Sequence, residues 1–259
     1  MQFSANLGFL FTELSLPQAI FAAHDCGFDA VECHFPYDVP AAEVAEALAA
    51  TGLPMLGLNT QRGNVVAGDF GLSALPGRQA EARAAIDEAI AYAAAIGALN
   101  VHVMAGKTDG GAAAEATFRD NLRYATDAAA RQGLSVLIEP INTRDVPGYH
   151  LNRVEHAAEI IAALGQSNLR LMFDCYHVQI TQGDLFHRLT EYLPLIGHVQ
   201  IAAVPDRGEP DAGELCYPQI LAHLAALGYA RPIGAEYRPR GGDTRAGLSW
   251  LEELRNTLP

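Results

Sequence analysis

Three carboxylate side chains stand at the ends of apolar runs, and they are the residues best suited to do chemistry. Glu139 follows the run Leu134–Ile138 and precedes Pro140, which stops regular strand pairing. Asp174 and Glu236 end two later apolar runs in the same way. A carboxylate at the end of a buried strand is costly unless a metal, a cation or a substrate pairs with it. The sequence therefore predicts a functional role for these acids.

Gln200 adds an amide oxygen to this set, because it is the inward-facing polar residue of another apolar run. Three acids that lie close together repel one another unless a cation lies among them. Carboxylate and amide oxygens suit a hard divalent ion, which predicts Mg²⁺ or Mn²⁺ as a cofactor. The alternative is an ordinary ion pair between each acid and a nearby arginine, which explains one such acid more readily than three.

A recurring unit is expected to position these side chains: a helical segment, a glycine, a short apolar run and a polar residue. The glycine suits the left-handed backbone that ends a helix. The segments between the runs carry Ala, Leu and Ile at helical spacing, most clearly in Ala80–Ala95 and Ala112–Ala130. The runs predict eight strands, at Phe3–Phe9, Phe28–Val31, Leu53–Leu58, Ala98–Val101, Leu134–Ile138, Leu169–Phe173, His198–Ile201 and Tyr229–Ala235.

Eight strands alternating with helices predict an α/β fold, a (β/α)₈ TIM barrel in one domain that spans residues 1–259. A doubly wound sheet is the alternative, but it needs a glycine-rich turn after the first strand, and Gly8–Leu10 supplies none. The glycine-rich segment Gln61–Gly77 is expected to cover the mouth of the barrel. The carboxyl ends of the strands should meet at that mouth, which brings together Glu32, Asn59, His102, Glu139, Asp174, Gln200 and Glu236.

Three further side chains are placed to hold a substrate. His177 lies three residues beyond one of the acids, and Arg207 lies seven residues beyond Gln200, so both are expected just above the acids. His102 ends the fourth strand and is expected at the same mouth. A solvated loop position is the alternative for His177, and His198 is expected to be a core residue with its hydrogen bonds satisfied.

The composition limits the partners of the chain. The formal net charge is −13, from 30 acids against 17 lysines and arginines. Such a surface repels phosphate backbones, so no nucleic-acid partner is expected.

The chain has no apolar run of transmembrane length and no signal-peptide pattern at Met1–Asn6, which predicts a cytoplasmic protein without a membrane partner. The residues at the mouth favour an anionic or hydroxylated small molecule as the partner, and the sequence is compatible with a homo-oligomer. The four cysteines lack paired spacing and are expected to be reduced.

Several long strings occur in a fixed order along the chain, and together they strongly resemble the hydroxypyruvate isomerase family. The resemblance covers nearly the whole chain, so chance is a poor explanation for it. The strings are Phe11–Glu13, Gly71–Gly77, His102–Gly106, Ile138–Asp145 with Pro147–Tyr149, Gly197–Ala202 with Pro205–Arg207 and Glu209–Asp211, and Glu236–Pro239 with Gly242–Thr244.

The resemblance implies a xylose-isomerase-like TIM barrel that interconverts hydroxypyruvate and 2-hydroxy-3-oxopropanoate. It therefore implies a small-molecule 2-oxo acid or short sugar acid as the partner. By match to the family pattern, Glu139 and Glu236 form the catalytic pair, and the metal ligands are Glu139, Asp174, Gln200 and Glu236. Close relatives in this family isomerise 2-oxo-tetronates and more distant ones epimerise ketoses, so these substrates stay open. The chemistry agrees, because two carboxylates acting as base and acid can move a proton between neighbouring carbons.

Three other functions compete with this interpretation. A Schiff-base aldolase needs a lysine at a strand end, but Lys107 lies in a loop and is the one lysine of the chain. A metal nuclease on the same barrel is disfavoured by the net charge of −13. A non-catalytic binding protein of the same fold would not need two carboxylates that face one substrate, and a turnover assay separates it from an enzyme.

Overall fold

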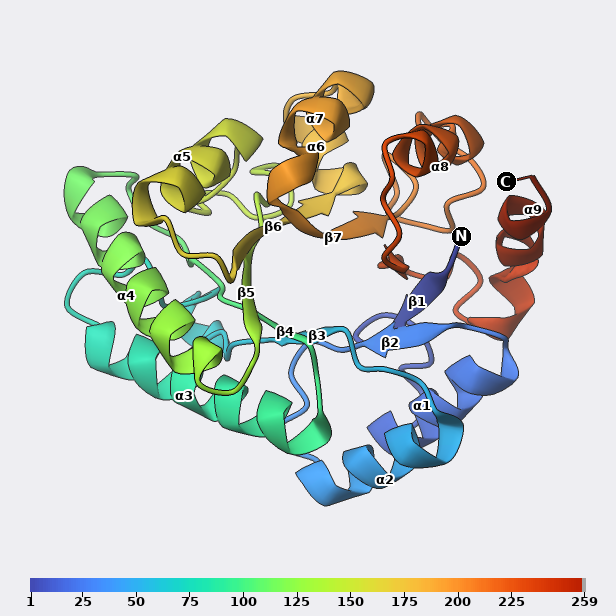
Figure 1. Ribbon diagram of the computed structural model, residues 1–259, viewed down its shortest axis with the longest axis horizontal. Coiled ribbons are helices and arrows are strands. Elements are labelled where there is room, and N and C mark those ends of the chain that lie inside the picture. Colours follow the sequence, from blue (N-terminus) through green and yellow to red (C-terminus); the bar gives the residue numbers. More distant parts are fainter. Residues whose placement is uncertain (258–259) are drawn as a thin grey trace.

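A computed structural model describes residues 1–257, and eight parallel strands form the centre of this part of the chain (Figure 1). Their order around the sheet is β2-β1-β8-β7-β6-β5-β4-β3. Val31 of β2 forms a parallel bridge with Met55, just before β3, so the two edges of the sheet meet and the barrel closes. The strands are β1 (Phe3–Asn6), β2 (Ala30–Glu32), β3 (Gly57–Asn59), β4 (Asn100–His102), β5 (Ser135–Ile138), β6 (Leu169–Asp174), β7 (Ile196–Ile201) and β8 (Ile233–Ala235).

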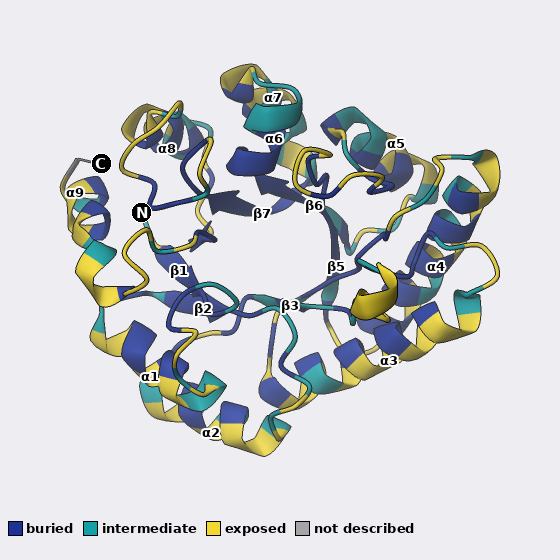
Figure 2. Cartoon of the chain, turned by 180° about the vertical axis from the view of Figure 1, so that it is seen from behind, coloured by how far each residue is buried: buried dark blue, intermediate teal, exposed yellow. Residues whose placement is uncertain are grey.

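Helices surround these strands, with buried residues on their inner faces and exposed residues on their outer faces (Figure 2). Within the described residues, no helix is both long enough and apolar enough to span a membrane. The helices are α1 (Leu16–Asp25), α2 (Ala41–Thr51), α3 (Gln79–Ile96), α4 (Ala112–Ala130), α5 (Val154–Leu164), α6 (Cys175–Thr181), α7 (Leu185–Tyr192), α8 (Tyr217–Ala226) and α9 (Ser249–Thr257), with 3₁₀ turns at Val65–Ala67, Leu193–Leu195 and Arg245–Gly247.

The predicted (β/α)₈ barrel is confirmed, although some strands are shorter than predicted. β3 and β8 begin only after Pro54 and Pro232, which have no N–H to donate to a neighbouring strand. β1 ends at Asn6, whose backbone carbonyl accepts hydrogen bonds from the N–H groups of Phe9 and Leu10 at 3.1 and 2.9 Å. The chain therefore turns at the mouth of the barrel where the sequence predicts three more strand residues.

The strand register brings the polar strand ends to one level. Asn59 pairs with His102 between β3 and β4, and Asp174 pairs with Gln200 between β6 and β7. Glu139 directly follows β5, and Glu236 directly follows β8. The carboxyl ends of six different strands therefore carry polar side chains at the same end of the barrel, as the sequence predicts.

The segment between β3 and α3 covers part of this mouth, as predicted for Gln61–Gly77. Gly71 forms an antiparallel bridge with Ala105, which ties the segment to the loop after β4. Gly71 has a φ of 111°, and a Cβ there would lie 2.7 Å from the backbone nitrogen of Gly106, so the bridge requires glycine. Arg62 and Phe70 of the same segment line the cavity at the mouth.

Candidate active site

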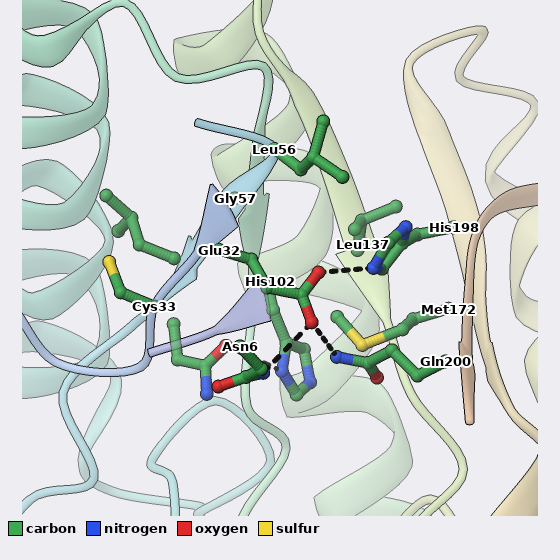
Figure 3. A pocket seen from close by; sticks show the side chains of 12 residues that line it. Asn6, Glu32, Cys33, Leu56, Gly57, His102, Leu137, Met172, His198 and Gln200 are labelled. Atoms are coloured by element: carbon green, nitrogen blue, oxygen red, sulfur yellow. Dashed lines mark hydrogen bonds and ion pairs between the residues drawn. The ribbon is translucent and has the colours of Figure 1, made fainter. Parts of the chain in front are cut away.

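The carboxyl ends of the strands surround a cavity of about 450 Å³. Asp174 is buried beside this cavity, and Gln200 lies deeper, in a smaller pocket toward the barrel interior (Figure 3). The other predicted site residues all line the cavity itself: His102, Glu139, His177, Arg207 and Glu236. The structure therefore brings these residues together at one end of the barrel, but the prediction of Glu32 at the mouth is wrong, because its carboxylate lines the smaller pocket beneath.

The three predicted carboxylates form one cluster. Nη2 of Arg207 donates to Oε2 of Glu236 at 2.6 Å and lies 3.4 Å from Oδ2 of Asp174. Nε2 of His177 lies 3.6 Å from Oδ2 of Asp174 and 3.7 Å from Oε1 of Glu139. One guanidinium and one imidazole thus bridge acids that come from three different strand ends.

Arg207 lies among the acids, whereas the sequence predicts it above them. Its guanidinium carbon is 5.0 Å from the ring centroid of Phe9 and 4.9 Å from that of Tyr176. Its backbone has a φ of 56°, a conformation that non-glycine residues rarely adopt. Two backbone hydrogen bonds hold this conformation, one to the carbonyl of Ala203 at 2.9 Å and one from the N–H of Arg238 at 2.8 Å. The loop therefore fixes one positive charge against two carboxylates.

The three acids of the cluster carry more negative charge than the neighbouring cationic side chains can balance. Burial, together with the charges of Glu236 and Asp174, raises the pKa of Glu139 well above its usual range. Burial raises the pKa of Asp174 to about 7, although Arg207 opposes this effect. Burial also disfavours the charged form of Glu236, but Arg207 and His34 outweigh it and hold the pKa of Glu236 below its usual range. A further cation would allow all three acids to be charged together.

A hydrogen-bond network beneath the mouth orients Gln200 (Figure 3). Nε2 of Gln200 and Nδ2 of Asn6 both donate to Oε1 of Glu32, each at 3.0 Å. The other carboxylate oxygen of Glu32 bonds to Nε2 of His198, which confirms His198 as a core residue with a satisfied hydrogen bond. Because Glu32 holds the amide nitrogen of Gln200, the amide oxygen points away from Glu32.

Two oxygens at this site are buried without a hydrogen-bond partner among residues 1–257. They are Oε1 of Glu139 and Oε1 of Gln200. A buried polar atom that lacks a partner costs roughly 1–3 kcal/mol, so these oxygens indicate a ligand. One donor atom each from Glu139, Asp174 and His177 lie within 4.8 Å of one another. These three donor atoms come from two carboxylates and one imidazole, and with the unpartnered amide oxygen of Gln200 they supply oxygens of the kind that a hard divalent cation binds.

His177 and His102 are neutral, and they carry the ring proton on different nitrogens. Nδ1 of His177 lies 3.3 Å from the backbone N–H of Asn142, a donor, so the ring proton of His177 is on Nε2 and faces the acids. Nδ1 of His102 lies 3.2 Å from Oδ1 of Asn59, an acceptor, so Nε2 of His102 carries a lone pair. Burial lowers the pKa of His177 and lowers that of His102 to about 4. His177 thus points a proton donor toward the acids, whereas Nε2 of His102 is buried without a hydrogen-bond partner among the described residues.

Two residues near Glu236 were missed by the sequence analysis. Nε2 of His34 lies 2.8 Å from Oε1 of Glu236, and Nδ2 of Asn6 donates to the same oxygen at 3.0 Å. Asn6 ends β1 and His34 lies two residues after β2, so the rule that polar strand ends meet at the mouth could have found both.

Comparisons with known proteins agree with this arrangement. The sequence model of the xylose isomerase-like TIM barrel family matches residues 20–254. The 2-oxo-tetronate isomerase of Cupriavidus necator is 48% identical, and the match covers 97% of each chain. The hydroxypyruvate isomerase of Escherichia coli is 38% identical, with 98% of this chain and 100% of that one covered. A solved structure described as AP endonuclease, family 2, from Brucella melitensis has a TM-score of 0.93 at 39% identity and covers 97% of this chain and 98% of that one.

Proposed function

This chain belongs to the xylose isomerase-like TIM barrel family, and we propose that it moves the carbonyl group of a short 2-oxo acid to the neighbouring carbon. Its relatives at 38% and 48% identity are isomerases, and the chain is an isomerase as well. The proposed substrate pair is hydroxypyruvate and 2-hydroxy-3-oxopropanoate. The observation that carries the proposal is the position of Glu139 and Glu236, which follow β5 and β8 and line one cavity.

The reaction needs two proton transfers on carbon and no outside oxidant. A base removes a proton from C3 of hydroxypyruvate, and the electron pair forms a C2–C3 double bond as negative charge develops on the C2 oxygen. An acid then protonates C2, and the proton of the C3 hydroxyl passes to the C2 oxygen, which leaves a carbonyl at C3. Glu139 and Glu236 act as the base and the acid, each worth roughly 10²–10⁴ in rate, and they exchange roles in the reverse reaction.

The neighbouring side chains support this chemistry. His177 points its Nε2 proton toward Glu139 and Asp174, and it is placed to donate to a substrate oxygen. Arg207 keeps a positive charge next to Glu236, where it favours negative charge that develops on the substrate. Because cationic and donor groups are fixed before the substrate binds, little reorganisation is needed during the reaction.

A divalent cation fits the same site, and the ligands we propose are Glu139, Asp174, Gln200 and Glu236. The unpartnered oxygens of Glu139 and Gln200 support this ligand set. All four donor atoms are oxygens, which favours Mg²⁺ or Mn²⁺. When bound, the ion would neutralise the crowded acids and polarise the oxygens of the substrate.

A 2-oxo-tetronate is a second candidate substrate, because the relative that acts on one is the more similar, at 48% against 38% identity. The same carbonyl shift between C2 and C3 serves both acids, which differ by a hydroxymethyl group on C3. A cavity of about 450 Å³ has room for either. We expect no action on DNA, because the chain carries a net charge of −13 and its acids gather at the mouth.

A substrate screen in D₂O tests the proposal. Hydroxypyruvate, 2-hydroxy-3-oxopropanoate, 2-oxo-tetronates and neutral ketoses are incubated with Mg²⁺, with Mn²⁺ or with a chelator, and proton NMR follows both product and deuterium at C2 and C3. Turnover of a 2-oxo acid with deuterium at the reacting carbon is expected, and the Glu139→Gln, Glu236→Gln double variant should lack it. Turnover of neutral ketoses alone would contradict the proposal.

A further inference from the structure

A second group of metal-binding side chains lies away from the mouth, between α4 and α5. Nε2 of His150 lies 3.0 Å from Oε2 of Glu115, and Nε2 of His156 lies 2.8 Å from the same oxygen. Glu115 is on α4, His156 is on α5, and His150 is in the loop before α5. α4 and α5 lie side by side in both views of the barrel (Figures 1 and 2). None of the three residues lines the cavity at the mouth.

We propose that Glu115, His150 and His156 form a binding site for a transition-metal ion of the Zn²⁺ type. One donor atom from each residue lies within 4.8 Å of the other two, so the atoms converge on one point. Two imidazole nitrogens and one carboxylate oxygen are a common ligand set for zinc, and imidazole disfavours the hard ions that the all-oxygen set at the mouth would bind. The two sites therefore select different metals.

Each of two proposed ligands is held by a further side chain, as is usual at metal sites. The hydroxyl of Thr108 lies 2.8 Å from Nδ1 of His150, so it fixes the ring with Nε2 toward the site. Nε of Arg119 donates to Oε1 of Glu115 at 2.5 Å, which leaves Oε2 for the site. These contacts orient the donor atoms before a metal arrives.

The site is open to solvent on one side. The side chain of His150 is 2% exposed, while those of Glu115 and His156 are 26% and 29% exposed. Three protein ligands leave the fourth position of a tetrahedral zinc ion for water, and the exposed side gives both the ion and the water access. A bound ion would join α4, α5 and the loop after β4, because the backbone N–H of His150 also donates to the carbonyl of Gly106 at 2.9 Å.

Calorimetric titration with zinc chloride tests the site, using untagged protein in saturating Mg²⁺ so that the oxygen site at the mouth is filled. Wild-type protein should bind one zinc ion per chain with an increase in Tm. Glu115→Gln and His156→Gln should each weaken binding about tenfold or more, while kcat with Mg²⁺ stays unchanged. His187→Gln is the matched control, because His187 also faces a glutamate, Glu191, at 3.3 Å but has no third ligand within residues 1–257.

Two further measurements separate a metal site from a simple group of ion pairs. Thr108→Val should weaken zinc binding about tenfold by freeing the ring of His150, and Thr108→Ser should restore it. Co²⁺ in place of zinc should give visible bands of nitrogen coordination that the His156→Gln variant lacks. Equal zinc binding by wild type, His156→Gln and His187→Gln, or Co²⁺ spectra without nitrogen ligands, would overturn the proposal.

Discussion

At the scale of single residues, the site depends on Glu139 and Glu236. Both are buried, and both reach the same cavity from different strands. We expect Glu139→Gln and Glu236→Gln each to lower kcat by at least about 10², because an amide fills the same space but cannot exchange the proton. Steady-state assays on hydroxypyruvate, with circular dichroism to check the fold, measure this effect.

Glu252→Gln is the control for that experiment, because Glu252 is exposed on α9 and its loss should leave kcat unchanged. If either active-site variant kept more than about a tenth of the wild-type kcat, the mechanism with two carboxylates would be wrong.

Arg207 tests how the substrate carboxylate is recognised. Its guanidinium contacts Glu236 and Asp174, and its Nε has no partner in the described part of the chain. Arg207→Ala should lower kcat/KM for hydroxypyruvate by an amount that corresponds to roughly 1.5–3 kcal/mol, the contribution of a charged hydrogen bond. Arg207→Lys should raise KM, because lysine lacks the planar fork of arginine. Neutral ketoses, where turned over, should lose less. Equal losses for charged and neutral substrates would assign Arg207 a structural role.

The sequence predicts the acids, Gln200 and the two histidines at the mouth because each belongs to a recurring unit whose end faces that mouth. It does not predict the contacts between these side chains. Arg207 reaches the acids because its backbone adopts the left-handed conformation in a loop, and no local sequence pattern predicts this conformation. Glu115, His150 and His156 come from separate segments with no motif spacing, so packing alone brings them together.

At the scale of elements, the turn after β1 controls the position of His34. A Cβ on Gly8 would lie 2.1 Å from Nδ1 of His34, so Gly8→Ala must move this ring and break its 2.8 Å contact with Glu236. We expect Gly8→Ala to lower kcat by about tenfold, with a moderate loss of stability of about 1–3 kcal/mol from overpacking. Kinetics and thermal unfolding measure the two effects.

Gly241→Ala is the matched control, because a Cβ on Gly241 would meet no atom of the described residues within 4 Å and its φ is not positive. Similar kinetics for the two alanine variants would rule out a role for the turn after β1 in holding His34.

The helices and strands are predicted well because one unit recurs along the chain, with an amphipathic helix and a buried apolar run in each repeat. Glycines at positions 52, 97 and 165 end α2, α3 and α5 with φ values of 70°, 69° and 63°, as the sequence predicts. The strand boundaries are predicted less well, because an apolar run continues past the last backbone pairing. Pro54 and Pro232 delay the start of two strands, and the turn after Asn6 ends the first one early.

At the scale of the whole molecule, the acid cluster should make stability depend on pH when no metal is present. The pKa of Asp174 rises from 3.8 to about 7 in the folded protein, so between about pH 4 and 7 the folded state holds a proton that the unfolded state has lost. Asp174 should therefore make the free energy of unfolding fall as pH rises through this window, by up to about 1.4 kcal/mol per pH unit for one proton. Glu139 acts in the same direction as Asp174, because its pKa is also raised. The lowered pKa values of His102 and His177 act in the opposite direction, because the unfolded state binds protons that these buried rings do not.

Denaturant unfolding at several pH values, with a chelator or with Mg²⁺, measures this dependence. Saturating Mg²⁺ should remove the contribution of the acids to the slope, because the ion stabilises the charged acids, and Asp174→Asn should remove the part that Asp174 contributes in the chelator. Glu252→Gln again serves as the control. A slope that neither Mg²⁺ nor Asp174→Asn changes would show that the acid cluster does not set it.

The hydrogen bond from Gln200 to Glu32 has a consequence for how this barrel can evolve. Without the carboxylate of Glu32, the amide of Gln200 would be free to flip and to present its nitrogen to the mouth. A substitution of Glu32 should therefore occur in relatives only together with a residue at position 200 whose orientation does not matter. A carboxylate is one example, because both of its terminal atoms are oxygens. An alignment of relatives should show positions 32 and 200 changing as a pair, and free variation of position 32 beneath an unchanged glutamine would contradict this.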